Sequence, residues 1–68
     1  MHREEIINTL KKRIEEEKED VTTYKILAEE CDRNGWRESA RVLHDIAHDE
    51  STHVIFISKM LEEYTERS

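Results

Sequence analysis

The stretch Arg33-Asn34-Gly35-Trp36 (RNGW, residues 33–36) contains the only glycine of the chain and lies near the middle of its 68 residues. Asn followed by Gly is a strong helix breaker, because glycine readily adopts the left-handed backbone conformation that ends many helices. The residues on both sides are rich in good helix formers, and proline is absent. The sequence therefore predicts one helix over about residues 3–33, a turn at 34–35 and a second helix over about residues 36–66.

Apolar residues recur at spacings of three and four in both predicted helices, the pattern of a helix that buries one stripe. The first stripe comprises Ile7, Leu10, Ile14, Glu17, Val21, Tyr24, Ala28 and Cys31. The second comprises Trp36, Ala40, Leu43, Ile46, Ala47, Glu50, His53, Val54, Ile57, Leu61 and Tyr64. A short turn makes neighbouring helices antiparallel, so we expect an all-α helical hairpin whose stripes meet in one seam. Residues 1–68 should form a single domain, with Cys31 and Trp36 packed near the turn.

Each stripe is interrupted by polar residues at one level only. Glu17 lies 18 residues before Gly35, whereas Glu50 and His53 lie 15 and 18 residues after it. With a rise of about 1.5 Å per residue, all three lie at a similar depth, about 25 Å from the turn. The sequence therefore predicts that three possible metal ligands meet in one layer of the seam.

A buried, ionised carboxylate is costly without a partner of opposite charge. Arg13 and Lys18 are near Glu17 in the sequence but lie outside the stripe, so a divalent metal ion is the simpler partner. Carboxylate oxygens and a histidine nitrogen suit iron or manganese, and zinc is a further option. Glu50 and His53 are three residues apart on one helical face and can bind the same ion. Glu17, Glu50 and His53 are therefore the predicted metal ligands.

A single hairpin of this length leaves its seam open on one side, and three ligands make only half a site. One cysteine excludes an internal disulfide, which leaves oligomerisation or a metal as the source of extra stability. A symmetric homodimer would supply both the missing packing and the missing ligands. The resulting four-helix bundle would hold four glutamates and two histidines in one layer, the ligand count of ferritin-like di-iron carboxylate proteins.

Two segments carry a family resemblance. YKILAEECDRNG (residues 24–35) and ARVLHDIAHDESTH (residues 40–53), preceded by Glu17, resemble in order and spacing the first helical hairpin of rubrerythrin-type ferritin-like proteins. The likeness covers about residues 14–61. The chain is also similar to encapsulin-associated ferritins, hairpins that complete a di-iron site by dimerising. Rubrerythrins contain both hairpins in one chain and often add a domain with cysteine-ligated iron, whereas this sequence has one hairpin and one cysteine.

The resemblance implies a di-iron protein that uses dioxygen or peroxide, with two iron ions per dimer and manganese or zinc as alternatives. A ferroxidase or another oxidoreductase activity is one outcome, and whether the protein turns over as an enzyme is left open. Glu50 would bridge the ions, with Glu17 and His53 as terminal ligands. Tyr24 would orient a ligand carboxylate through a hydrogen bond. Asp20, three residues after Glu17 at the edge of the stripe, is a candidate accessory ligand.

Composition limits the other function classes. A net charge of −6 with 41% charged residues argues against nucleic acid as a partner. No segment has the apolar length of a membrane span or a signal peptide, and a lone unpaired cysteine favours a reducing compartment, so we expect a cytoplasmic location. The alternative function is a non-catalytic interaction module whose polar layer sets the register of the helices. The chain could also be a fragment of a longer protein.

Overall fold

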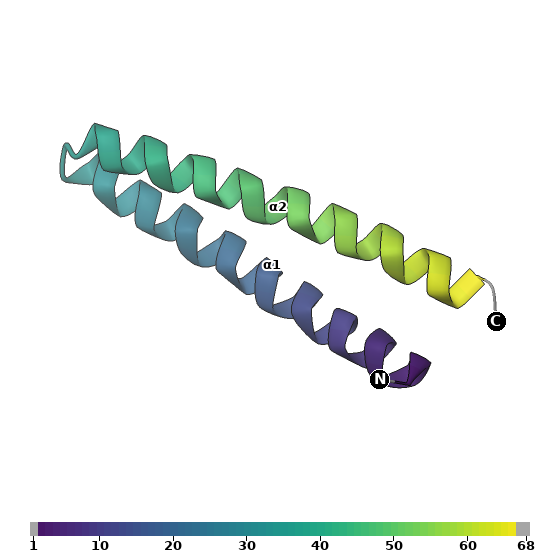
Figure 1. The fold of residues 1–68 in the computed structure, drawn as a ribbon. Coiled ribbons are helices and arrows are strands. Elements are labelled where there is room, and N and C mark those ends of the chain that lie inside the picture. The colour runs from purple at the N-terminus through teal and green to yellow at the C-terminus, as the bar shows by residue number, and fades with distance from the viewer. Residues whose placement is uncertain (1, 67–68) are drawn as a thin grey trace.

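The computed structural model describes residues 2–66, which form two helices joined by a short turn. Helix α1 (Arg3–Arg33) and helix α2 (Arg37–Glu66) lie side by side in opposite directions, with the turn at one end and both chain ends at the other (Figure 1). The molecule is 51 Å long and 15 Å across. The predicted all-α helical hairpin is confirmed, and α2 begins at Arg37, one residue later than expected.

The turn has the hydrogen bonds of a Schellman motif. The Trp36 N–H donates to the Cys31 carbonyl at 2.8 Å, and the Gly35 N–H donates to the Asp32 carbonyl at 3.0 Å. Gly35 has a φ of +77°, the left-handed conformation that favours glycine. Trp36 directly precedes α2, and its carbonyl accepts the first hydrogen bond of that helix, from the N–H of Ala40 at 3.0 Å. The RNGW stretch thus both ends α1 and begins α2.

The seam between the helices is narrow and contains few large side chains. Its buried apolar residues are Ile14, Ala28, Ala40 and Ala47. Small side chains let the two helix axes approach each other, but they bury little apolar area. The remaining apolar residues of the stripes are half buried, with one exception. Trp36 is 62% exposed, so the expectation that it is packed near the turn is wrong.

The exposure of Trp36 has a local cause. Trp36 is the third residue beyond the end of α1 and lines an open surface pocket with Cys31 of that helix and with residues of the first turns of α2. The seam itself begins farther along, at Ala40, which is buried. A hairpin has no third element at this end to cover the other side of the indole ring.

One side of the hairpin carries an uncovered apolar surface, which we call the apolar face. It consists of Leu27 from α1 and Val42, Phe56 and Met60 from α2, all between 42% and 58% exposed. Since α-helical residues three, four and seven apart share a face, the three residues of α2 form one stripe beside the seam. Cys31 and Val42 line one pocket, which places the stripes of the two helices on the same side of the hairpin.

At the open end of the hairpin, the Arg3 guanidinium donates a hydrogen bond to the Tyr64 carbonyl and joins the first turn of α1 to the last turns of α2. Within the described residues, neither helix has a stretch that is both long and apolar enough to cross a bilayer.

Candidate metal centre

Glu17, Glu50 and His53 come together near the middle of the hairpin. Each offers one ligand atom, and these atoms lie within 4.8 Å of one another. The Nδ1 atom of His53 is 3.5 Å from Oε1 of Glu50 and 3.7 Å from Oε2 of Glu17. Helix α1 supplies one carboxylate and helix α2 supplies the other carboxylate and the imidazole, one turn apart. The three residues therefore lie in one layer, as the sequence predicted. Their role as metal ligands stays a prediction.

Exposure rises steadily across the cluster. The Glu17 side chain is 8% exposed, Glu50 is 19% exposed and His53 is 52% exposed. His53 lies three residues before Phe56 and seven before Met60, so it belongs to the stripe of the apolar face. The cluster is consequently closed toward the seam and open toward the apolar face.

Arg13 binds the most buried carboxylate of the cluster. Its Nη2 atom donates to Oε1 of Glu17 at 2.7 Å, and its Nη1 atom donates to Oε1 of Glu16 at 2.9 Å. Arg13, which lies outside the stripe, therefore does reach this layer. Arg13 precedes Glu17 by four residues, a spacing at which side chains of a helix meet, and this spacing was the signal in the sequence. The long arginine side chain reaches the layer from outside the stripe.

The other oxygen of Glu17 is left without a partner. Oε2 is buried and accepts no hydrogen bond within the described part of the chain. An unsatisfied buried oxygen of an ionised carboxylate is costly, and such atoms are rare in folded proteins. This atom is also the one that faces His53. The structure therefore has a buried negative atom aimed at a position where a cation would satisfy it.

The two carboxylates differ in their affinity for a proton. When Glu50 is protonated it can donate a hydrogen bond to Glu17, which raises the pKa of Glu50 most, and burial and the charge of Glu17 raise that pKa further. The same hydrogen bond lowers the pKa of Glu17 below its ordinary value, and the nearby Arg13 cation acts in the same direction against the effect of burial. Of the two carboxylates, Glu50 is therefore the one that takes up a proton first as the pH falls.

The donor set fits a divalent metal ion of the iron, manganese or zinc group. Two carboxylates and one imidazole are the ligand types that these ions prefer in proteins, and the unpaired Oε2 of Glu17 supplies a ready donor. Three groups on one side of an ion leave its other positions open. The hairpin by itself therefore presents a cluster that could hold one such ion.

Asp20 and Tyr24 lie outside this cluster. Asp20 is exposed, and its charge is close enough to raise the pKa of Glu50. Tyr24 is half buried, and its hydroxyl does not donate to Oε2 of Glu17, because that oxygen accepts no hydrogen bond from the described residues. The accessory role of Asp20 and the orienting role of Tyr24 stay predictions.

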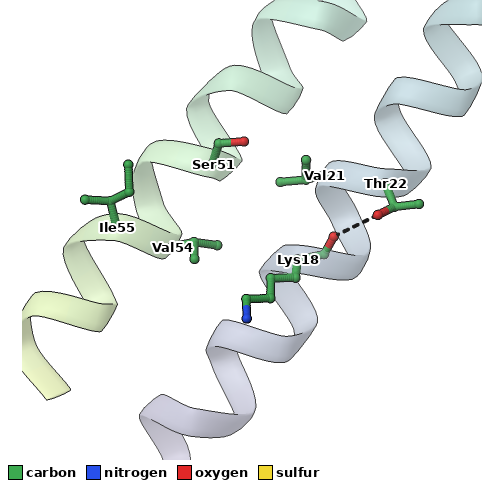
Figure 2. A pocket seen from close by; sticks show the side chains of 6 residues that line it. All are labelled: Lys18, Val21, Thr22, Ser51, Val54 and Ile55. Atoms are coloured by element: carbon green, nitrogen blue, oxygen red, sulfur yellow. Dashed lines mark hydrogen bonds between the residues drawn. The ribbon is translucent and has the colours of Figure 1, made fainter.

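The opposite side of the hairpin carries an apolar groove at the same level. Figure 2 shows its lining side chains, with Val21 and Val54 pointing toward each other across the space between the helices. The groove is lined by Lys18, Val21, Thr22, Ser51, Val54 and Ile55. Lys18, Ser51 and Val54 each directly follow one of the three clustered residues, but none of the cluster lines the groove. The open edge of the cluster is therefore on the apolar face and not on the grooved one.

An antiparallel hairpin that places a glutamate opposite a Glu-x-x-His pair is the half-unit of a ferritin-like carboxylate protein. The family model described as Rubrerythrin matches residues 8–68 of the chain, which therefore belongs to the rubrerythrin family. The family match and the Glu/Glu/His cluster together indicate an iron-binding protein. No curated protein and no solved structure matches the chain.

Proposed function

We propose that the chain is a di-iron protein whose metal site is completed when two hairpins associate as a homodimer. The observation that carries this proposal is the buried, unpaired Oε2 atom of Glu17, which belongs to a three-residue cluster that opens onto the apolar face. A partner bound to the apolar face would therefore both cover its apolar side chains and supply further ligands to the cluster. A two-fold axis near His53 would bring a second set of Glu17, Glu50 and His53 against the first.

Packing supports the same arrangement. The residues of the apolar face, together with Trp36, are large apolar side chains that a single hairpin leaves exposed, while its buried core is mostly alanine. A chain of 68 residues with so small a core gains most from association, because burial of each large apolar side chain contributes about 1.5–3 kcal/mol. Association through this face would also remove water from the open edge of the cluster.

The residues of the cluster have distinct proposed roles. Glu17 would bind through its buried oxygen, His53 would bind from the exposed edge, and Glu50 would be the ligand shared between the two ions. A bound pair of ferrous ions supplies two electrons to the O–O bond of dioxygen or peroxide, which would make the protein a ferroxidase or an oxygen- or peroxide-reducing enzyme. The chain itself holds the ions at a fixed separation and keeps open positions for the oxidant.

One observation favours a second candidate function, a non-catalytic interaction module. The Arg13–Glu17 ion pair satisfies half of the buried carboxylate without any metal, as expected of a polar layer that only sets helix register. This candidate predicts no stoichiometric metal and a different protein as the partner of the apolar face.

Elemental analysis of anaerobically purified protein, combined with sedimentation, separates the two candidates. The di-iron proposal expects a dimer that binds one ferrous ion per chain and melts at a higher temperature with the ion than with a chelator. Glu50→Leu should abolish binding while leaving the metal-free protein at least as stable, because it removes a half-buried polar group. Glu62→Leu, an exposed glutamate of the same helix, is the matched control. A dimer that binds no iron or manganese would overturn the proposal.

A further inference from the structure

Arg13 forms a two-pronged ion pair beside the metal cluster. One terminal nitrogen of its guanidinium binds Glu16 and the other binds Oε1 of Glu17. The Glu16 side chain is 44% exposed, whereas Glu17 is 8% exposed. The Nη1 atom of Arg13 therefore lies near solvent, and its Nη2 atom reaches into the layer of the cluster. A guanidinium held at two points has little freedom to rotate, which fixes the atom it presents to Glu17.

The two oxygens of Glu17 therefore have different surroundings. Oε1 accepts a charge-assisted hydrogen bond of 2.7 Å from Arg13. Oε2 is buried, accepts no hydrogen bond in the described structure and lies 3.7 Å from Nδ1 of His53. A carboxylate can bind a metal ion through one oxygen or through both. An oxygen already held by a cation is the poorer metal ligand, so the other oxygen is favoured.

We infer that Arg13 is a positioning residue that restricts Glu17 to one-oxygen ligation and thereby keeps one coordination position of each ion free. This inference rests on the proposed di-metal function and specifies how its most buried ligand works. A Glu17 that chelated with both oxygens would occupy the position that an incoming oxidant needs, since catalytic metal sites keep a position open. Arg13 also places a positive charge beside the ions, which weakens cation binding while the free position is preserved.

A surface ion pair with no effect on the metal is the competing explanation, because most exposed pairs contribute little. Arg41 provides a matched example on α2. It pairs with Glu38 one turn away, both side chains are more than 70% exposed, and neither belongs to the metal cluster. Arg13 differs from Arg41 in the burial of its acidic partner and in the contact of that partner with the cluster. Substitution of each arginine by methionine keeps the apolar length of the side chain and removes the charge.

The test uses Co²⁺ as the probe in the 68-residue chain, with the oligomeric state of each variant checked by sedimentation. The visible absorption of Co²⁺ weakens as its coordination number rises, so it reports whether Glu17 has gained a second ligating oxygen. For Arg13→Met we expect a weaker Co²⁺ absorption than in the wild type, a lower melting temperature without metal, and a larger metal-induced rise in melting temperature. Arg41→Met should match the wild type in all three measurements. Arg13→Gln, which keeps a polar side chain, should behave as Arg13→Met does.

The outcomes separate this inference from the function on which it rests. If the wild type binds Co²⁺ and both Arg13 variants have the wild-type spectrum and the wild-type metal-induced shift, the positioning role is wrong and the metal site stands. If the wild type binds no Co²⁺, the proposed function fails and the positioning role fails with it. A weaker absorption in Arg41→Met as well would show that the change comes from loss of surface charge and would also overturn the inference.

Discussion

The imidazole of His53 lies one turn beyond Glu50 on α2, with its Nδ1 atom 3.5 Å from Oε1 of that carboxylate. The ring is 52% exposed, while Glu17 opposite is 8% exposed. Glu50 and His53 therefore extend from the buried seam to the uncovered apolar face. A partner that covers this face would meet His53 first, and the imidazole is the part of the cluster that association would change most.

Removal of the imidazole should weaken metal binding without unfolding the hairpin. In His53→Ala we expect the affinity for ferrous iron or Co²⁺ to fall by at least about tenfold, because one ligand per ion is lost. The stability of the metal-free protein should stay within about 0.5 kcal/mol, as is usual for exposed positions. His48→Ala, an exposed histidine of the same helix, is the control. Isothermal titration measures the metal affinity of both variants, and urea unfolding measures their stability. An equal loss of affinity in the two variants would contradict the assignment of His53 as a ligand.

The metal-free protein should lose stability as the pH rises toward neutrality. The pKa of Glu50 is raised above its ordinary value of 4.5, so its protonated form stabilises the fold at low pH, and this contribution disappears as the pH rises through the folded-state pKa. Glu17 has a lowered pKa and acts in the opposite sense, since its contribution is lost only as the pH falls through its own folded-state value.

Urea denaturation of chelator-treated protein between about pH 4 and about pH 7 measures this dependence. Glu50→Gln keeps the shape of the side chain and cannot ionise, so its stability should decline less over this range than that of the wild type. Parallel curves for the two proteins would show that Glu50 is not the group responsible.

A charge on the apolar face should break the proposed dimer. In Phe56→Glu, association would bury an unpaired carboxylate, so we expect the dissociation constant of the dimer to rise by at least about tenfold. Ile55→Glu is the control, because Ile55 is adjacent in sequence and similarly exposed but lines the groove on the opposite side. Sedimentation equilibrium of both variants tests the dimer face. Dissociation by Ile55→Glu alone would place the interface on the grooved side.

Substitution of the turn glycine should cost stability through the backbone alone. A Cβ atom added at Gly35 would have no neighbouring atom within 4 Å, but the φ of +77° is unfavourable for other residues. Gly35→Ala should therefore lower the free energy of unfolding by about 1–2 kcal/mol, and Gly35→Asn by less, since asparagine tolerates this conformation better. Urea unfolding at fixed protein concentration gives both values. A stability of Gly35→Ala equal to that of the wild type would mean that the turn can rearrange.

The hairpin was predictable because its determinants are local. Asn34-Gly35 is the one strong breaker in a chain of helix formers, and counting residues from it places Glu17, Glu50 and His53 at one depth. The Arg13–Glu17 contact was missed because a stripe pattern assigns each residue to the seam or to solvent. A long side chain crosses that boundary, since its stem follows the helix surface while its charged end reaches a neighbour four residues away.

Packing between copies cannot be derived in the same way. The exposed position of Trp36 follows from the number of elements that surround it, which periodicity does not determine. The homodimer, the roles of Asp20 and Tyr24, and the cytoplasmic location accordingly stay predictions.

The exposed Trp36 also gives the protein an intrinsic optical reporter. It is the only tryptophan of the chain, and 14 residues of helix, about 21 Å, separate it from Glu50. Because the side chain is 62% exposed, we expect the emission of a hydrated indole from the isolated hairpin. A shift of that emission to shorter wavelength as the protein is concentrated would therefore signal that the turn end has been shielded from water, independently of any event at the glutamates.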